Sequence, residues 1–304
     1  MRNLLLRVAD HEGLVRLLAW IGRRSGLAHR FVAGETARET FEVVRQLEQA
    51  GLDTTLDLLG EGVSRDQEAV AATEAYKRLL RKIQQENIPS GISIKLTQLG
   101  LEIDRSLCSE NLGSILQEAE KTGIFVTVDM ESSAYTQSTL DLFQQHYAAY
   151  GVDRVGIVIQ AYLYRSEQDI RDLTALGCNI RLCKGAYMEP PDQAFPKKVD
   201  VDRNFEKLLE IMLGSPAYSA IATHDEQMIR RAMELIREKG VSKSMYEFQM
   251  LYGVRRDRQF QLLNEGYRVR VYVPFGTQWA PYFIRRLAER PANLLFAMKN
   301  LLRA

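Results

Sequence analysis

Eight short apolar runs alternate along this chain with longer amphipathic segments, and this alternation restricts the possible folds more than any other feature. The runs are rich in Val, Ile, Leu, Thr and aromatic residues, as buried strands usually are. The segments between them repeat apolar residues at helical spacing. Strands that alternate with helices in this way indicate parallel βαβ units. The runs are Leu52–Leu59, Ile92–Leu96, Ile124–Met130, Val155–Tyr162, Asn179–Cys183, Ala220–Thr223, Tyr246–Leu251 and Val269–Val273.

Several of the helical segments begin at Ser or Asp and end at or near Gly, which are typical residues for helix ends. Eight units are the number that closes a parallel barrel, and an open doubly wound sheet is the competing arrangement. We favour the barrel. The clearest helical segments are Ser64–Asn87, Ser109–Gly123, Asp225–Gly240 and Asp257–Gly266.

The length of 304 residues suits one barrel with extra helices, so we expect a single domain over residues 1–304. Gly13–Arg24 and Glu35–Ala50 read as two helices. Residues 1–51 would then be N-terminal helices packed on the barrel, and residues 52–304 would form the barrel and C-terminal helices.

Composition excludes several classes of protein. Lys and Arg number 40 against 39 Asp and Glu, and both signs are scattered, so no global field attracts nucleic acid. Three cysteines without CxxC spacing argue against a disulfide framework and suit a reducing cytoplasm. No apolar stretch approaches the roughly 18 residues of a membrane span, and the start of the chain lacks a signal-peptide pattern. We therefore expect a cytoplasmic protein.

Polar or charged side chains stand at the ends of nearly all the apolar runs. A barrel brings the carboxyl ends of its strands together at one mouth, where active sites form. A structural layer of mutually neutralising charges would give a similar pattern, but contributions from at least six strands favour a ligand site. The excess of cations favours an anionic ligand. These residues are Asp57, Lys95, Asp129, Glu131, Gln160, Arg181, Lys184, Tyr187, Thr223, His224, Glu247, Gln249 and Tyr272.

A helix is predicted to begin at Pro281, directly after the last strand. Tyr282, Arg285, Arg286 and Glu289 lie three or four residues apart and share one face of it. Two adjacent arginines can hold one small carboxylate, and Glu289 can fix Arg285. A solvated face with an ion pair has the same spacing, but the position just beyond a barrel strand favours function.

Other site classes find little support. No GxGxxG, P-loop or GxSxG motif is present, so a nucleotide is not bound in the Rossmann or Walker manner and a serine hydrolase is not indicated. The four histidines are widely separated, so we expect no metal site. Lys95 or Lys184 could form a Schiff base, which leaves a lyase or aldolase on the same barrel as an alternative. A binding module without catalysis is a further alternative.

Eight segments, in order and at barrel spacing, together resemble the proline dehydrogenase family in its short monofunctional bacterial form. The resemblance runs from about Leu52 to Glu289. It implies an α/β fold, a distorted (βα)8 TIM-like barrel with additional N-terminal helices, that holds FAD at its mouth without a Rossmann domain. It also implies oxidation of L-proline to 1-pyrroline-5-carboxylate by hydride transfer to FAD N5, the first step of proline catabolism to glutamate. The segments are SIKLTQLG, TVDMES, IQAYLYR, RLCKGAY, ATHD, EFQMLYG, VYVPFG and YFIRRLAE.

The resemblance implies roles for individual residues. Asp129 and Arg181 would lie beside the flavin and the reacting carbon. Lys95, Arg285 and Arg286 would bind the carboxylate of L-proline. The pocket around the proline ring would be shaped by Leu251, Tyr272, Tyr282 and Glu289, and the cofactor would be contacted by Met130, Val158, Gln160, Arg181, Lys184, Gly185, Ala186, Tyr187, Thr223, His224 and Gln249.

Partners are implied in the same way: L-proline, a quinone or other electron acceptor, and a separate 1-pyrroline-5-carboxylate dehydrogenase that takes up the product. The apolar and basic segment Leu4–Arg24 suits either a helix packed on the barrel or peripheral contact with the inner face of the membrane. Two departures from the family pattern, Met188 where Trp is common and Asp225 where Asn is expected, concern the cofactor's surroundings. They leave FMN open as a substitute for FAD.

Overall fold

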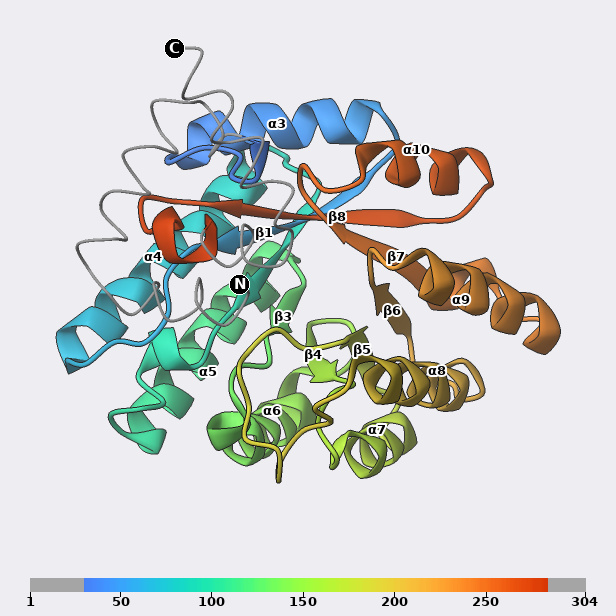
Figure 1. The fold of residues 1–304 in the computed structure, drawn as a ribbon. Coiled ribbons are helices and arrows are strands. Elements are labelled where there is room, and N and C mark those ends of the chain that lie inside the picture. The colour runs from blue at the N-terminus through green and yellow to red at the C-terminus, as the bar shows by residue number, and fades with distance from the viewer. Residues whose placement is uncertain (1–29, 284–304) are drawn as a thin grey trace, which may run out of the picture.

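Eight parallel strands close into a barrel in the order β1 to β8, as the alternation predicts (Figure 1). The computed structural model describes residues 30–283. Strands β1 and β8 close the barrel, with Asp53 opposite Arg270 and Leu58 opposite Phe275. The barrel prediction is confirmed, and the open sheet is wrong. The strands are β1 (Asp53–Leu58), β2 (Ser90–Ile94), β3 (Val126–Val128), β4 (Val155–Gln160), β5 (Asn179–Cys183), β6 (Ser219–Ala222), β7 (Tyr246–Leu251) and β8 (Val269–Phe275).

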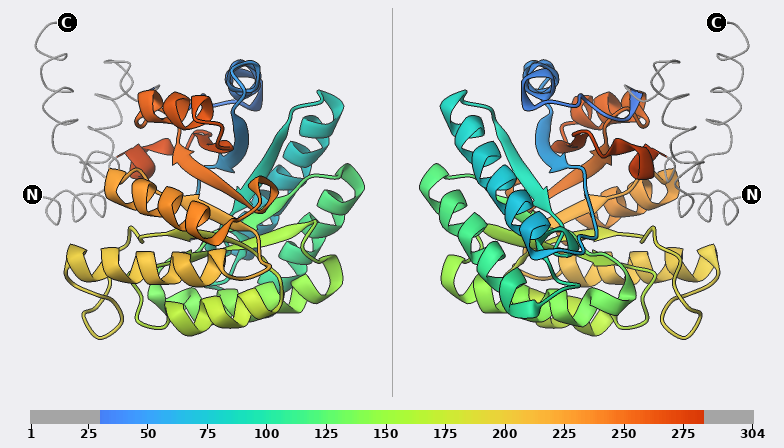
Figure 2. Two further views of the ribbon diagram at one scale, coloured as in Figure 1. Left: turned by 90° about the vertical axis from the view of Figure 1, so that its right-hand side faces the viewer. Right: turned by 90° about the vertical axis from the view of Figure 1, so that its left-hand side faces the viewer.

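Helices form an outer layer around the strands (Figures 1 and 2). Short 3-10 helices η2 (Thr97–Leu99), η3 (Ser133–Tyr135) and η4 (Lys243–Met245) lie in three of the connections. No helix among residues 30–283 is long and apolar enough to cross a bilayer. The α-helices are α3 (Ala37–Gln49), α4 (Asp66–Gln85), α5 (Arg105–Thr122), α6 (Thr136–Tyr150), α7 (Ser166–Ala175), α8 (Lys198–Leu213), α9 (Glu226–Lys239) and α10 (Arg256–Asn264).

Capping residues account for where the helices begin. Helix α5 starts before the predicted Ser109, because the Asp104 side chain accepts a hydrogen bond from the backbone N–H of Leu107 at 2.7 Å. Asp225 caps α9 in the same way, as its position in the sequence predicts. Gly123 ends α5 in the left-handed conformation, which glycine adopts without strain.

The second predicted N-terminal helix is present as α3, which begins with a capping box formed by Thr36 and Glu39. Phe41 and Val44 on its inner face are buried in the main core. The other predicted helix, Gly13–Arg24, lies outside the described residues.

The pleat of the strands separates an apolar outer face from a polar inner face. In β8, Val271 and Val273 join the apolar core beneath the helices. Their neighbours Arg270 and Tyr272 bond side chains from other strands, and Tyr272 donates to Asp129. The barrel interior is therefore unusually polar, and its buried polar side chains include Thr55, Asp57, Ser93, Thr127, Gln160, Arg181, Glu247 and Gln249.

The apolar core beneath the helices stabilises the fold, and helix α8 offers a matched pair of positions to test this. Phe205 is 0% exposed, whereas Val199 on the same helix is 53% exposed. We expect Phe205→Ala to lower the free energy of unfolding by about 3–5 kcal/mol. Val199→Ala should change it by no more than about 0.5 kcal/mol. Urea unfolding followed by circular dichroism measures both, and equal losses would contradict this description of the core.

Candidate active site

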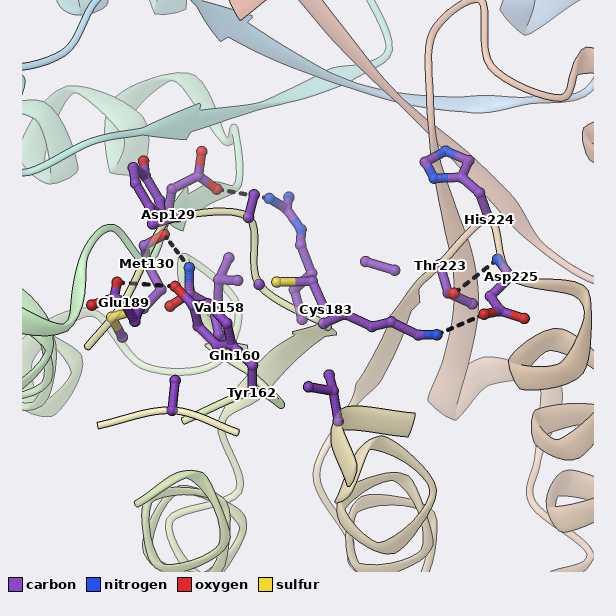
Figure 3. Close-up of a pocket in the computed structure, with 18 of the residues that line it drawn as sticks. Asp129, Met130, Val158, Gln160, Tyr162, Cys183, Glu189, Thr223, His224 and Asp225 are labelled. Carbon is purple, nitrogen blue, oxygen red and sulfur yellow. Dashed lines mark hydrogen bonds and ion pairs between the residues drawn. The ribbon is translucent and has the colours of Figure 1, made fainter. Parts of the chain in front are cut away.

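A cavity of about 1080 Å³ opens at the carboxyl ends of the strands (Figure 3). Lys95 and Asp129, which directly follow β2 and β3, form part of its wall. Gln160 and Tyr272 contribute from β4 and β8. Cavities for small ligands usually measure about 300–1000 Å³, so this one has room for a large cofactor or for a cofactor together with a small substrate.

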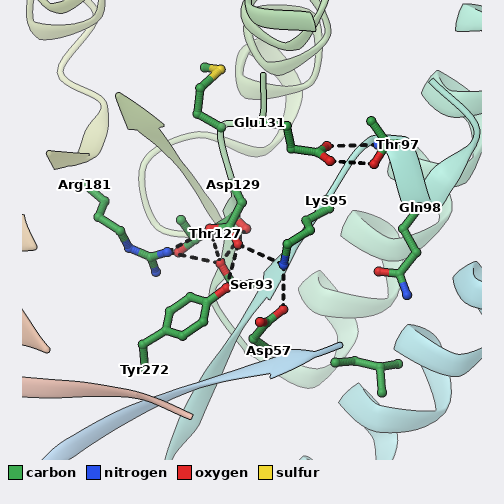
Figure 4. Close-up of polar contacts among 12 residues, drawn as sticks. Asp57, Ser93, Lys95, Thr97, Gln98, Thr127, Asp129, Glu131, Arg181 and Tyr272 are labelled. Atoms are coloured by element: carbon green, nitrogen blue, oxygen red, sulfur yellow. Dashed lines mark hydrogen bonds and ion pairs between the residues drawn. The ribbon is translucent and has the colours of Figure 1, made fainter. Parts of the chain in front are cut away.

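Four side chains converge on the carboxylate of Asp129 (Figure 4). Its Oδ1 accepts hydrogen bonds from Ser93 Oγ at 2.7 Å and from Arg181 Nη1 at 2.8 Å. Its Oδ2 accepts from the hydroxyl of Tyr272 at 2.7 Å, and Lys95 Nζ lies 3.5 Å away. Strands β2, β3, β5 and β8 are therefore joined at a single carboxylate.

Lys95 has a second and closer carboxylate partner in Asp57 of β1, at 2.8 Å. Both side chains are buried. Buried charges are stable only when they are paired, and here the two cations Lys95 and Arg181 balance the two anions Asp57 and Asp129. We call these four residues the interior charge network.

The protonation states in this network follow from burial and neighbouring charge. Burial alone would raise the pKa of Asp129, but the charges of Lys95 and Arg181 outweigh burial and hold that pKa below its ordinary value. Burial dominates at Asp57 and raises its pKa despite the nearby Lys95. Burial also opposes the charged form of Lys95, yet its anionic neighbours hold the pKa of Lys95 well above the ordinary value. Lys95 is therefore an ammonium ion at neutral pH.

Arg181 and Gln160, in the cavity wall, have buried hydrogen-bonding atoms without a protein partner. Arg181 Nε and Nη2 are buried without a protein partner, and the guanidinium carbon lies 5.2 Å from the ring centre of Tyr272. Gln160 donates to the carbonyl of Met130 at 3.3 Å, but its own Oε1 accepts no bond. An unpaired buried polar group costs about 1–3 kcal/mol, so these atoms suit a ligand with both acceptors and donors.

The segment after β5 is pressed against Tyr162. The backbone N–H of Tyr162 donates to the carbonyl of Lys184 at 2.9 Å. Gly185 has φ +106°, and a Cβ added to it would lie 2.4 Å from the Tyr162 ring. The Tyr162 hydroxyl donates to Glu189, which also accepts from the backbone N–H of Ser133. Only glycine fits at position 185, because its φ lies in the region that glycine favours and the Tyr162 ring occupies the space that a Cβ would need.

A second set of charges lies at the rim. Lys184 Nζ is 2.5 Å from Asp202 and 2.7 Å from Asp225, and Lys198 contacts the same two carboxylates. Burial alone would raise the pKa of Asp225, but its bonds to Lys184 and Lys198 hold it well below the ordinary value. Lys184 does line the cavity, but two carboxylates compensate the positive charge that the sequence suggested it would add there.

His224 and Leu251 both line the cavity and are joined by a hydrogen bond. The backbone N–H of Leu251 donates to His224 Nε2 at 2.9 Å, so this nitrogen carries no proton. The carbonyl of His224 accepts from Arg255 at 3.0 Å, which holds the residue between β6 and β7.

The prediction that Glu247 adds negative charge at the mouth is wrong. Glu247 is the second residue of β7, and it accepts from Arg270, the second residue of β8, at 2.7 Å. Both lie near the amino ends of their strands. Gln249, two residues further along the same inner face, does reach the cavity and donates to Glu247 at 2.6 Å.

The structure brings most of the predicted site residues together around the cavity. Tyr282 is buried in a separate apolar cluster with Phe31 and Trp279, and it is not among the described residues that line the cavity. Arg285, Arg286 and Glu289 lie outside the described residues. The predicted residues that line the cavity are Lys95, Asp129, Met130, Val158, Gln160, Arg181, Lys184, Gly185, Ala186, Tyr187, Thr223, His224, Gln249, Leu251 and Tyr272.

Three polar residues around the site were not among those that the sequence singled out. Ser93 lies two residues before Lys95, so the period of the pleat would have placed it on the same inner face. Glu189 and Asp202 lie in the loop after β5 and in α8, where no local pattern marks them.

Comparisons with known proteins agree on one family. The sequence profile of the family described as proline dehydrogenase matches residues 40–299. Proline dehydrogenase 1 of Bacillus subtilis (strain 168) is 41% identical over 303 residues, which cover 100% of this chain and 99% of that protein. The proline dehydrogenase of Deinococcus radiodurans is 39% identical over 310 residues, with 99% and 98% covered.

A solved structure is similar over the barrel. Proline utilization A (PutA) from Bdellovibrio bacteriovorus, inactivated by N-propargylglycine, superimposes with a TM-score of 0.82 at 25% sequence identity. The match covers 87% of this chain and 32% of that one, so this chain corresponds to about a third of the longer protein.

The interior charge network predicts a large cost for removing one of its members. Asp129→Asn leaves the buried cations short of one carboxylate, so we expect the free energy of unfolding to fall by about 3–5 kcal/mol. The matched control is Asp141→Asn, which removes a partly exposed partner of Arg105 at 3.1 Å and should cost less than about 1 kcal/mol. Urea titration compares the two, and similar small losses would show that the network does not depend on Asp129.

Proposed function

The chain belongs to the proline dehydrogenase family, and on this premise we propose that FAD and L-proline bind together in the cavity at the mouth of its barrel. Members of this family are flavoenzymes that oxidise L-proline in the first step of its catabolism, and the chain is an enzyme of this kind. The observation that carries the placement is the buried Arg181, with two unpaired donors beside Lys95 and Asp129 at the strand ends.

The cavity suits a flavin dinucleotide on three counts. Its volume of about 1080 Å³ exceeds what proline alone needs. Arg181 and Gln160 offer unpaired donors and an unpaired acceptor, as a flavin ring with alternating acceptors and donors requires. Gly185 contributes a part of the wall that carries no side chain. FAD would supply the ring atom N5 that accepts a hydride from the proline carbon beside nitrogen, and FMN is the alternative cofactor.

We assign Lys95 to the carboxylate of the substrate. Asp57 and Asp129 keep Lys95 charged, so it can form a charge-assisted bond to an anion without losing its proton. Arg285 and Arg286 join it in this proposal because the sequence predicts that both lie on one helix face directly after the barrel. A carboxylate held at one end orients the ring, and orientation is the main requirement of a hydride transfer.

Asp129 would act by positioning rather than by accepting a proton. Its oxygens already accept from Ser93, Arg181 and Tyr272, and its pKa is lowered. Arg181 would supply a fixed positive charge that stabilises negative charge developing in a site with little water. The charge of Arg181 would thus already be in place before the reaction begins, so no rearrangement is needed to stabilise the developing negative charge.

The remaining assigned residues would form walls. Tyr272 and Leu251 line the cavity near Arg181 and His224, and with Tyr282 and Glu289 they would enclose the proline ring. The cofactor would be contacted by Met130, Val158, Gln160, Arg181, Lys184, Gly185, Ala186, Tyr187, Thr223, His224 and Gln249.

A Schiff-base lyase has no support from this geometry. Imine formation needs a neutral amine, and the pKa of Lys95 is well above its ordinary value. Lys184 Nζ is already engaged by Asp202 and Asp225, so it is not presented to a carbonyl as a free amine. Borohydride treatment in the presence of substrate should therefore trap no lysine adduct.

The partners beyond L-proline are also proposals. We propose that electrons pass to a quinone-type acceptor and that a separate 1-pyrroline-5-carboxylate dehydrogenase consumes the product. Residues 1–304 would form one barrel domain with its flanking helices, in the cytoplasm. Contact of Leu4–Arg24 with the inner face of the membrane would be tested by sedimenting the whole chain and a chain without these residues with anionic liposomes.

The proposed function predicts a yellow protein. Purified protein should show a flavin absorption spectrum, and L-proline added without oxygen should bleach the long-wavelength band, because the cofactor takes up two electrons from the substrate. Mass spectrometry of the released cofactor distinguishes FAD from FMN. A colourless protein that takes up neither cofactor would overturn the proposal, and D-proline serves as the control substrate.

The carboxylate clamp predicts a defect in substrate binding. Arg286→Met removes one charge-assisted bond, which is worth about 1.5–3 kcal/mol, so KM for L-proline should rise about 10- to 150-fold. The matched control is Arg237→Met at the exposed end of α9, with an unchanged KM. A normal KM in folded Arg286→Met enzyme would remove Arg286 from the clamp.

A further inference from the structure

Thr97 and Glu131 tie together three consecutive loops at the barrel mouth, and Figure 4 shows the bonds between these two residues. Glu131, in the loop after β3, accepts hydrogen bonds from the backbone N–H of Thr97 at 3.0 Å and from its hydroxyl at 2.5 Å. Thr97 begins η2 after β2, and its hydroxyl in turn accepts from the backbone N–H of Gly62, in the loop after β1, at 3.1 Å. The backbone N–H of Val63 donates to the Thr97 carbonyl at 3.4 Å.

The three tied loops directly follow three members of the interior charge network. Asp57 lies at the end of β1, Lys95 is two residues before Thr97, and Asp129 is two residues before Glu131. Where β2 and β3 end, the backbone N–H of Asp129 donates to the carbonyl of Ile94, the last residue of β2, at 2.9 Å. Beyond the end of the sheet, the Glu131 carboxylate accepts from the backbone N–H of Thr97, as a backbone carbonyl would between paired strands.

The burial of the Glu131 carboxyl lowers the stability of the fold at neutral pH. It is 4% exposed and Thr97 is 2% exposed. Burial dominates over the Thr97 hydrogen bonds and raises the pKa of Glu131 from 4.5 to about 6. An acid with a raised pKa in the folded state lowers stability as the pH rises through this interval, because the unfolded chain loses its proton first. At neutral pH this carboxyl therefore works against folding, which is expected of residues kept for a functional geometry.

We propose that Glu131 and Thr97 are positioning residues that hold Lys95 and Asp129 in register at the mouth and fix the loop at residues 59–64 beside them. The proposal rests on the proposed function, since Lys95 and Asp129 are the groups assigned there to substrate and to Arg181. The tie fixes the backbone immediately beyond each charged group, so the separation of these groups does not depend on the ion pairs alone. We therefore expect a weaker tie to disturb the orientation of the substrate while the protein remains folded.

The test combines kinetics with amide hydrogen exchange. Glu131→Gln replaces the oxygen that accepts from the Thr97 hydroxyl, and Thr97→Val removes that hydroxyl and leaves Gly62 N–H without its partner. We expect both variants to raise KM for L-proline about 10-fold, the effect of one lost hydrogen bond, with a smaller change in kcat. Exchange in the peptide spanning residues 59–64 should become about 10-fold faster. Thr97→Ser keeps the hydroxyl and should restore both values.

Glu118→Gln is the matched control, because Glu118 is also a buried carboxylate that ties two elements, α5 and α4, through Arg81 at 2.7 Å. We expect it to lower stability and to leave KM and exchange at residues 59–64 unchanged. Active wild-type enzyme with Glu131→Gln and Thr97→Val variants that match this control would overturn the positioning role. Wild-type protein that does not oxidise proline would instead overturn the proposed function, and the two failures are thereby distinguished.

Discussion

The pairing of Asp129 with Arg181 and Lys95 inside the barrel is the interaction on which the rest of the mouth depends. Charges can be buried only when they compensate each other, and each of these residues comes from a different strand or strand end. The strands must therefore meet in one register for any of the charges to be tolerated. Arg181 uses only part of its guanidinium in this pairing, and Nε and Nη2 keep N–H groups without a protein partner. The arrangement that allows Arg181 to be buried therefore also leaves it donors for a ligand.

The pleat of the strands allows stability and chemistry to share eight short segments. Outward side chains such as Val271 and Phe248 pack under the helices, while inward side chains such as Tyr272 meet across the barrel. The interior is itself divided along its axis. Glu247 and Arg270 pair near the amino ends of the strands, whereas the groups that face the cavity lie at the carboxyl ends. The polar interior thus contains a buried ion pair near the amino ends of the strands and a binding surface at their carboxyl ends.

The sequence predicted the fold well because alternation is a local property. All eight strands, and the caps at Asp225 and Gly123, follow from patterns a few residues long. The placement of Glu247 failed because the depth of a residue in a barrel depends on register between strands, which no single strand encodes. The compensation of Lys184 was missed for a related reason, since Asp202 approaches it from a helix surface. The tie between Thr97 and Glu131 likewise joins loops whose proximity exists only in the closed barrel.

Gly185 has a consequence for how this wall can change over generations. A single added carbon there would collide with Tyr162, and moving that ring would disturb its bond to Glu189. A smaller residue at 162 would remove the collision but not the strain, because a φ of +106° is a conformation that L side chains rarely adopt. Among related sequences position 185 should therefore remain glycine even where position 162 has changed, so the constraint between the two positions runs in one direction.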